Sequence, residues 1–356
     1  MTIVGPFLAL IVTVLFMFTL RPVAVEVGLV DVPGGRKRHK ARVPLIGGIA
    51  MTVGLGFGSS LVGAPVFWNP VLLSVYLLVA VGTVDDRYEL PPSVRLIAQS
   101  CAAMLVVFGA EISVTHLGAP LFFDLPLGPV AIVFSILFIV TVISAFNVID
   151  GLDGLAGGLA FIAIAALAAL SFGTELWILN VLVLAVISGF LIFNLPLPFN
   201  RSVRVFMGDA GSTSLGLAVA ALGIALCQGP ESRIAPVTGL WLIAVPVYDL
   251  FSAITRRLIA GRSVFEPDHH HLHHVLIEQG FSHRSALALM LGIALLFALI
   301  GLGGDLAGVP QGFMLLGWIG GGVLYYRAMN AWGAVLRKLE RAVRRTPRLT
   351  DSSSPS

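Results

Sequence analysis

The sequence predicts an all-α integral membrane protein, and three observations lead to this class. Hydrophobic residues make up 57% of the 356 residues, charged residues make up 12%, and the mean hydropathy is +0.95. Ordinary soluble domains do not combine these values. Long apolar stretches recur along the chain, and a helix needs about 20 such residues to cross a bilayer. The basic residues fall almost entirely in alternate connections, which is typical of a multi-pass protein.

Eleven stretches are apolar and long enough to be predicted as membrane-spanning helices. Several contain glycine or proline, which membrane helices tolerate better than soluble helices do. The first stretch has no basic residue before it and no small-x-small cleavage site, so we expect it to be retained. In chain order the stretches are residues 2–20, 44–63, 66–83, 94–110, 128–146, 155–171, 175–194, 211–227, 236–255, 285–302 and 310–327.

The basic residues predict the orientation of the chain. Of the 22 Lys and Arg residues, 21 lie on one side of the predicted topology and only Arg233 lies on the other. The positive-inside rule places the basic side in the cytoplasm, with the N-terminus outside and the C-terminus inside. We expect residues 1–330 to form one membrane catalytic domain with a site on the cytoplasmic face. Residues 331–356 are predicted to be a basic, partly disordered cytoplasmic tail.

Five polar motifs lie on this same side. Each has an ordinary structural explanation when taken alone, such as a helix cap, an Asp-Gly turn or a chance run of histidines. A zinc site in the histidine run is the weaker interpretation, because no Cys accompanies it and the run gives no defined His-x-x-x-His pair on a predicted helix. Their occurrence on one face favours a shared functional site. The motifs span residues 36–44, 84–92, 147–153, 204–212 and 256–274.

The residue types in these motifs indicate phosphate chemistry. Carboxylates beside Lys, Arg and His at a membrane surface are suited to Mg²⁺, which prefers oxygen ligands and leaves room for substrate phosphates. Glycines allow backbone amides to approach those phosphates closely. Cationic donors would stabilise charge during phosphoryl transfer. A soluble phosphorylated donor and a lipid phosphate acceptor would suit such a face.

The chain resembles the polyprenyl-phosphate N-acetylhexosamine-1-phosphate transferase family. The end of the last motif, followed by residues 280–284, is similar to the WecA/TagO-like branch rather than the peptidoglycan branch. Leu272 replaces the isoleucine of the family pattern. The matching segments are LVDVPGGRKRHKARVPLIGG (29–48), VDDRYELPP (84–92), NVIDGLDGLAGG (147–158), RVFMGDAGSTSLG (204–216) and PDHHHLHH (267–274).

The resemblance implies a reaction and its setting. UDP-N-acetylglucosamine would give its sugar 1-phosphate to undecaprenyl phosphate and release UMP, which starts O-antigen, common-antigen or teichoic acid synthesis. The implied cofactor is Mg²⁺, with Mn²⁺ as the alternative. The implied location is the bacterial inner membrane, with a cytoplasm-facing site and pairing of two copies through membrane helices. A different UDP-N-acetylhexosamine donor stays open.

The resemblance also implies roles for the acidic residues. Asp85 and Asp86 match the Asp-Asp pair, one of which would orient or deprotonate the attacking lipid phosphate. A covalent phospho-aspartate is the rival mechanism, and direct attack is preferred because a phosphate is already a nucleophile. Asp209 matches the metal-binding aspartate, and Asn147 would be a second ligand.

The remaining implied roles concern the substrates. Asp150, Asp153 and Phe206 are expected to bind the nucleotide, with Phe206 stacking on uracil. Asp249, near the cytoplasmic end of the ninth stretch, is expected to lie behind the residues that contact the substrates and to hold them in place. The groups expected to contact the diphosphate or sugar are Arg257, His271, His273 and His274, and those expected to bind the lipid phosphate are Lys40 and Arg42.

A secondary transporter is the alternative functional class. Many spans with Gly or Pro interruptions and carboxylates at membrane depth are typical of transporters. The coupling acids of a transporter are expected near the bilayer midplane, whereas these acids lie at the predicted cytoplasmic ends of the spans.

Overall fold

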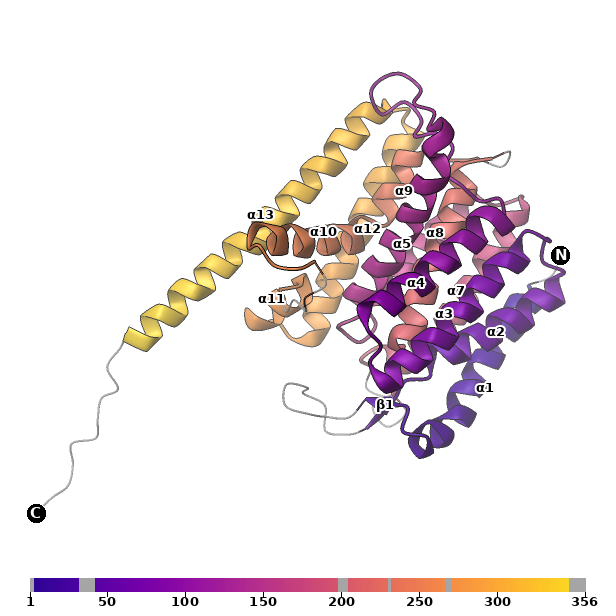
Figure 1. Ribbon diagram of the computed structural model, residues 1–356, viewed down its shortest axis with the longest axis horizontal. Helices are drawn as coiled ribbons and strands as arrows, with labels where there is room; N and C mark the ends of the chain where they lie inside the picture. The colour runs from indigo at the N-terminus through magenta and orange to yellow at the C-terminus, as the bar shows by residue number, and fades with distance from the viewer. Residues whose placement is uncertain are drawn as a thin grey trace, which may run out of the picture.

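The computed structural model describes residues 3–31, 42–197, 204–229, 232–264, 266 and 270–345, the last 14 of these by backbone alone. Each of the eleven predicted stretches is largely helical in it (Figure 1). The helices are α1 Val4–Glu26, α2 Gly47–Val62, α3 Trp68–Tyr88, α4 Pro92–Met104, α5 Ala131–Ile149, α6 Leu155–Leu170, α7 Glu175–Asn194, α8 Gly208–Cys227, α9 Pro236–Leu242, α10 Ala244–Ile259, α11 Leu272–Glu278, α12 His283–Leu306 and α13 Gln311–Arg345. A π-helical turn, Leu105–Gly109, extends α4, and a 3₁₀ turn, Gly128–Val130, precedes α5.

The predicted all-α, multi-pass membrane fold is confirmed. Within the described residues, seven helices are long and apolar enough to cross a membrane. The pair α9 and α10 makes an eighth candidate if it is counted as one broken span, and α2 and α6 are shorter apolar helices. The count of eleven crossings stays a prediction.

The prediction of one continuous helix over 236–255 is wrong. The chain bends by 79° between α9 and α10, where Ile243 leaves the helical region with φ −112° and ψ 16°. Pro246 lies in the first turn of α10. A proline there lacks the N–H that would continue the helix, and its ring clashes with the carbonyl of Leu242, four residues earlier. As a result α10 crosses the bundle at a steep angle (Figure 1).

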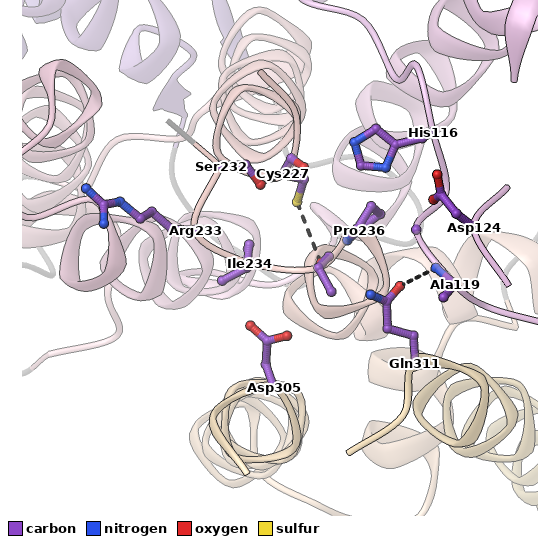
Figure 2. A pocket seen from close by; sticks show the side chains of 12 residues that line it. His116, Ala119, Asp124, Cys227, Ser232, Arg233, Ile234, Pro236, Asp305 and Gln311 are labelled. Atoms are coloured by element: carbon purple, nitrogen blue, oxygen red, sulfur yellow. Dashed lines mark hydrogen bonds between the residues drawn. The ribbon is translucent and has the colours of Figure 1, made fainter. Parts of the chain in front are cut away.

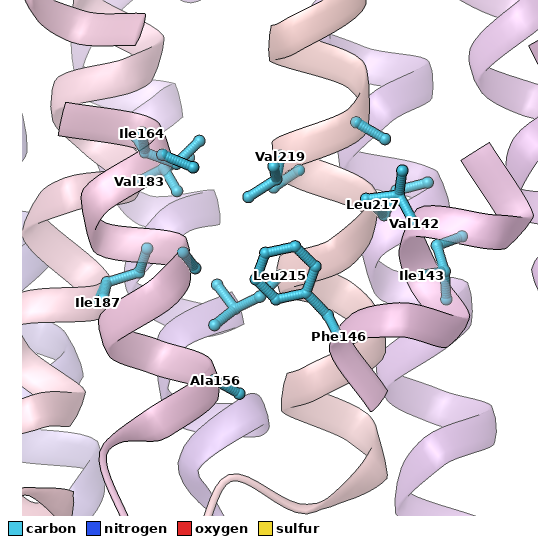
Figure 3. Close-up of a cluster of buried hydrophobic side chains, with 14 of the residues drawn as sticks. Val142, Ile143, Phe146, Ala156, Ile164, Val183, Ile187, Leu215, Leu217 and Val219 are labelled. Atoms are coloured by element: carbon cyan, nitrogen blue, oxygen red, sulfur yellow. The ribbon is translucent and has the colours of Figure 1, made fainter. Parts of the chain in front are cut away.

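Helix α8 occupies the centre of the bundle. Of its apolar 18-residue window, 89% is buried, and it packs against α2, α3, α5 and α6. Figure 3 shows Leu215, Leu217 and Val219 of α8 between side chains of α5 on one side and of α6 and α7 on the other. Close packing of small residues is the usual way in which membrane helices associate, because lipid gives no hydrophobic drive between them.

A short sheet joins the N-terminal region to the start of α8. Strands β1 (Val30–Asp31) and β2 (Val43–Pro44) pair antiparallel. The next residue, Leu45, forms a parallel bridge with Phe206. The N–H of Phe206 donates to Pro44 O at 2.9 Å, and the N–H of Gly47 donates to Phe206 O at 3.0 Å. The first motif and the fourth motif are therefore adjacent in the fold.

Candidate active site

The Asp-Asp motif at the end of α3 meets the N-terminus of α8. One oxygen of Asp86 accepts the backbone N–H of Asp209 at 2.7 Å, and the other accepts that of Ala210 at 3.4 Å. A carboxylate at this position satisfies N–H groups that lack partners at the start of a helix and interacts favourably with the helix dipole. Gly208 has φ +71°, and a Cβ there would lie 2.2 Å from the Asp86 carboxylate. The glycine thus makes the contact sterically possible.

Asp85 and Asp209 flank one arginine. Arg95 Nη1 lies 3.4 Å from Asp85 and 3.7 Å from Asp209. Asp85 is 5% exposed, and its other oxygen accepts the N–H of Leu90 at 2.6 Å. Arg95 belongs to the first turn of α4, which begins after the Pro91-Pro92 pair. This guanidinium offsets part of the negative charge that three carboxylates concentrate at this point.

Asn147 completes this group from the end of α5. Its Nδ2 donates to Asp209 Oδ1 at 2.8 Å and to the Ser212 hydroxyl at 3.1 Å. A cavity of about 20 Å³ lies beside these residues, and its lining includes Asp85, Arg95, Asn147 and Asp209. That volume holds about one water-sized species. The cavity is therefore a polar space at the meeting point of four helices.

The donor set of this space fits Mg²⁺. Asp209 and Asn147 supply hard oxygen donors on neighbouring helices, and Mg²⁺ is commonly bound by one or two carboxylates together with substrate phosphates. In the described part of the chain, no group of three His, Cys, Asp or Glu side chains is spaced to hold a metal by itself. A metal held here would thus depend on substrate oxygens for much of its coordination.

The loop that follows α5 forms one wall of the same site. Burial and the negative charges of Asp209, Asp86 and Asp153 raise the pKa of Asp150 to about 8. Asp153 forms an ion pair with Arg204 at 2.9 Å. Asp150 is therefore the acid of this loop that the surroundings keep protonated near neutral pH.

Asn194, at the end of α7, holds two motif loops together. Its Oδ1 accepts the N–H of Gly154 at 2.6 Å, and its Nδ2 donates to Val205 O at 2.9 Å. The side chain is 5% exposed. Because both amide ends are bonded, Asn194 fixes the position of the 147–153 loop relative to residues 204–206.

The histidine motif packs against the 147–153 loop. An ideal Cβ on Gly151 would lie 2.2 Å from His273 Nε2, so this ring lies against the loop backbone. Burial first, and then the neighbouring His274, lowers the pKa of His273 to about 3. Both ring nitrogens of His273 are buried without a hydrogen-bond partner among the described residues. Such unsatisfied buried groups are uncommon and often indicate a place for a ligand or water.

His271 is held differently from His273. Its Nδ1 lies 2.6 Å from Asp249 Oδ2, and its ring is parallel to that of His273, with centroids 5.9 Å apart. His274 lies 4.1 Å from His273, centroid to centroid. Three of the five histidines of the motif thus form one cluster.

The other predicted residues have less direct connections to this site. Phe206 is half-buried in its bridge with Leu45. Arg257 Nη1 donates to Val264 O. Arg42 is exposed directly before β2. Lys40 lies outside the described residues, as do residues 267–269 of the histidine motif.

Sequence reasoning missed several residues that the fold brings to the site. Arg95 follows Asp86 by nine residues, and the intervening Pro91-Pro92 turn is the feature that could have indicated its return toward the carboxylates. Asn194 and Tyr325 carry no motif of their own. Only the packing of α7 and α13 shows that their side chains reach the motif loops.

A larger cavity than this one lies elsewhere in the described structure. It has a volume of about 510 Å³ and is lined by the connections 116–124 and 232–236 and by the facing ends of α12 and α13. Figure 2 shows Asp305 and Gln311 facing His116 and Asp124 across it. None of the five motifs contributes to its lining. The small cavity beside Asp209 is therefore the candidate active site.

Known proteins with similar sequences show the family to which the chain belongs. The family described as "Glycosyl transferase family 4" matches residues 68–227, which include the Asp-Asp motif, the 147–153 loop and the start of α8. An undecaprenyl-phosphate alpha-N-acetylglucosaminyl 1-phosphate transferase of Pasteurella multocida is 37% identical, with 98% of each chain covered. Proteins of the same name from Haemophilus influenzae and Escherichia coli K12 are each 35% identical, over 98% and 94% of this chain and 98% and 93% of their own. The chain therefore belongs to glycosyl transferase family 4 and to the same family as these undecaprenyl-phosphate alpha-N-acetylglucosaminyl 1-phosphate transferases.

Proposed function

We propose that the chain is a phosphoglycosyltransferase that moves N-acetylglucosamine 1-phosphate from UDP-N-acetylglucosamine to undecaprenyl phosphate and releases UMP. The observation that carries this proposal is the convergence of Asp85, Asn147 and Asp209 on one small cavity, with Asp86 bonded to the backbone of Asp209. Relatives that cover 98% of the chain and bear this activity in their names support the same donor and acceptor.

We further propose that the chain crosses the bacterial inner membrane eleven times, with the site at the cytoplasmic face. The five motifs follow every second predicted span. The first three motifs each contact the fourth, and the fifth contacts the third. Eleven passes put the N-terminus outside and the C-terminus inside. The location of 21 of the 22 basic residues on the motif side supports the cytoplasmic assignment.

The position of the acids argues against a transporter. Asp85 and Asp86 stand at the end of α3, and Asp209 stands in the first turn of α8. Acids that couple ion movement to transport are expected near the middle of a span. These carboxylates instead face the loops that connect the helices, where a water-soluble nucleotide could reach them.

In the proposed reaction, an oxygen of the lipid phosphate forms a bond to the β-phosphorus of the donor. The bond from that phosphorus to the bridging oxygen breaks, and UMP leaves with that oxygen. Both reactants are anions, so the site must offset their repulsion. Asp209 and Asn147 would hold Mg²⁺, or Mn²⁺ in its place. When bound, this ion supplies charge neutralisation and fixes the orientation of the diphosphate oxygens.

We propose different tasks for the two residues of the Asp-Asp pair. Both oxygens of Asp86 are occupied by the N-terminus of α8, so Asp86 holds Asp209 in place. Asp85 lines the small cavity next to Arg95. In our proposal Asp85 orients the lipid phosphate and accepts its proton, while Arg95 attracts the phosphate into the site.

The donor would bind along the second wall of the site. Asp150, Asp153 and Phe206 are proposed to hold the uridine, as the family resemblance implies. His273 offers two unbonded ring nitrogens to the diphosphate and sugar. The rings of His271 and His274 lie next to that of His273, and Arg257 of α10 is proposed to contact the same groups, as the family resemblance implies.

The test is release of UMP from UDP-N-acetylglucosamine by the purified protein with undecaprenyl phosphate and Mg²⁺. We expect Asp209→Ala to lower turnover at least 100-fold, a loss typical of removing a group that stabilises the transition state. Turnover near that of the unaltered protein would refute the metal assignment. A panel of UDP-N-acetylhexosamines in the same assay identifies the preferred donor.

The rival covalent mechanism has its own test. The protein is incubated without lipid acceptor but with donor that carries radioactive phosphorus in its β-phosphate, and is then denatured. Direct attack predicts no label on the protein. Label trapped on Asp85 or Asp86 would overturn direct attack in favour of a phospho-aspartate.

A further inference from the structure

Asp249 is a buried carboxylate that three different elements contact. It lies on α10 and is 1% exposed. Its Oδ2 lies 2.6 Å from His271 Nδ1, and its Oδ1 accepts the Tyr325 hydroxyl at 2.8 Å and the Leu272 N–H at 3.0 Å. A buried carboxylate costs several kcal/mol of desolvation free energy unless such partners satisfy it. The three bonds satisfy Asp249 completely.

We propose that Tyr325 and Asp249 are positioning residues for His271. Tyr325 fixes the Asp249 carboxylate, and Asp249 keeps the proton of the neutral imidazole on Nδ1. The Nε2 of His271 then faces away from Asp249 and is available to the diphosphate of the donor. A carboxylate behind one imidazole nitrogen sets the tautomer and the ring plane in many metal and catalytic sites. This inference rests on the proposed function, because it assigns the diphosphate as the group that His271 contacts.

The position of His271 also affects the neighbouring ring of His273. His273 has no hydrogen bond of its own in the described structure, and its ring lies parallel to that of His271, with 6° between the planes. The orientation of His273 therefore depends on packing against His271 and the backbone at Gly151. A displaced His271 would also displace the ring whose nitrogens are unsatisfied.

A helix cap alone does not explain Asp249. The carboxylate does accept the N–H of Leu272 at the start of α11, but that helix has only seven residues. Serine or asparagine would accept the same bond at a lower desolvation cost. The bonds to His271 and to Tyr325, 76 residues away, instead connect the histidine motif to α13.

The experiment compares three single variants of the full-length protein in the UMP-release assay. Tyr325→Phe removes the hydroxyl and keeps the ring, so we expect kcat/KM to fall roughly 3- to 10-fold. Asp249→Asn replaces the carboxylate, and we expect a loss of roughly 10- to 100-fold, mostly in kcat. The control is Tyr326→Phe, which removes a hydroxyl from the next residue of α13 and should change kcat/KM less than about 2-fold.

A coupling measurement separates positioning from general stability. If Tyr325 acts through His271, Tyr325→Phe should have no further effect on kcat/KM in a His271→Ala background. An equal loss in both backgrounds would overturn the proposal. So would Asp249→Asn with unchanged kcat/KM, or variants that lower the thermal midpoint while kcat and KM stay constant.

A second readout does not depend on activity. In protein labelled with ¹⁵N-histidine and free of substrate, the His271 signal is assigned by its loss in His271→Ala. The proposal predicts a protonated Nδ1 in the unaltered protein and loss of this state in Asp249→Asn. A His271 that carries its only proton on Nε2 would overturn it. If no UDP-sugar supports UMP release, the proposed function fails. The protonation of His271 Nδ1 still tests whether Asp249 positions His271.

Discussion

At the residue scale, ionisation of Asp150 lowers the stability of the folded protein. Burial and the negative charges of three other acids raise the pKa of its carboxyl from 3.8 to about 8. In the unfolded chain the same group ionises near its ordinary pKa. Between these two values the folded protein binds a proton that the unfolded chain has lost. The stability contributed by the protonated form is therefore complete below about pH 4 and is lost as the pH rises toward 8.

This shift predicts that Asp150→Asn stabilises the metal-free protein. Asparagine stays neutral at every pH, so the gain should be absent near pH 4 and largest above pH 8, on the order of 1 to 3 kcal/mol. Thermal unfolding at pH 5 and pH 8.5 in the presence of a chelator measures this difference. The same variant should lose activity, because it changes a residue that we propose binds the nucleotide.

Asp153→Asn is the matched control for this prediction. Asp153 lies three residues along the same loop, but its carboxylate is paired with Arg204 at 2.9 Å. Removal of that charge should leave the thermal midpoint unchanged or slightly lower at both pH values. An equal stabilisation by both variants would show that the charge of the loop as a whole, rather than the environment of Asp150, sets the effect.

At the scale of the helices, the site depends on how closely α3 approaches α8. A Cβ on Gly82 would lie 2.5 Å from the backbone N and Cα of Ala210. Backbone atoms cannot move aside as the end of a side chain can. Three residues after Gly82 comes Asp85, and one residue before Ala210 is Asp209. The spacing of these helices therefore sets the spacing of the carboxylates.

Gly82→Ala should consequently push α3 away from α8. We expect a loss of about 1 to 3 kcal/mol in stability from overpacking, together with a loss of at least about 10-fold in kcat/KM from misplaced carboxylates. Gly223→Ala, near the C-terminal end of α8, is the control because nothing lies within 4 Å of its added Cβ. The argument would be wrong if the two alanines had equal effects on UMP release.

At the scale of the whole molecule, the two ends of the bundle have different chemistry. The motif loops meet at one end. At the other end, Gln228 accepts the N–H groups of Thr115 and His116, and Gln311 accepts that of Ala119. These bonds attach the 112–127 connection to α8 and α13. A single cysteine in an exposed loop at each end can report the side of the membrane on which that end lies.

The proposed orientation predicts which of these cysteines is accessible from outside. In a background of Cys101→Ala and Cys227→Ala, Asp124→Cys should react with a membrane-impermeant maleimide in intact spheroplasts. Arg262→Cys, in the turn after α10, should react only after permeabilisation. The reverse pattern would invert the topology, and labelling of both positions in intact spheroplasts would contradict an odd number of crossings between them.

The sequence predicted the helices and the shared face of the motifs because both depend on local composition. Hydropathy is averaged over about 20 residues, and basic residues are counted loop by loop. The break before α10 was not predictable in this way. Pro22 lies inside α1, which continues past it, whereas Pro246 coincides with a 79° bend. Only the packing around each proline distinguishes the two outcomes.

The parts of the site that sequence reasoning missed are those made by tertiary contact. Arg95, Asn194 and Tyr325 stand in apolar or helical surroundings without a motif. Their partners lie between 10 and 114 residues away in the chain. The roles proposed for Asp85, Asp150 and His273 stay predictions until the assays described above are done. Their proximity, however, follows from the packing of α3, α5, α8 and α11.

The central position of α8 has a consequence for how the protein is made. The four helices that it contacts most, α2, α3, α5 and α6, are synthesised before it. Its apolar window has a mean hydropathy of 1.8, against 2.6 for α5, α7 and α12, because small residues replace lipid-facing ones. During translation α8 therefore enters a space that earlier helices have already lined, and it has little surface to offer to lipid. A nascent chain that stops before residue 208 holds Asp85 and Asn147 without Asp209, so the small cavity that these three residues line forms only after α8 is made.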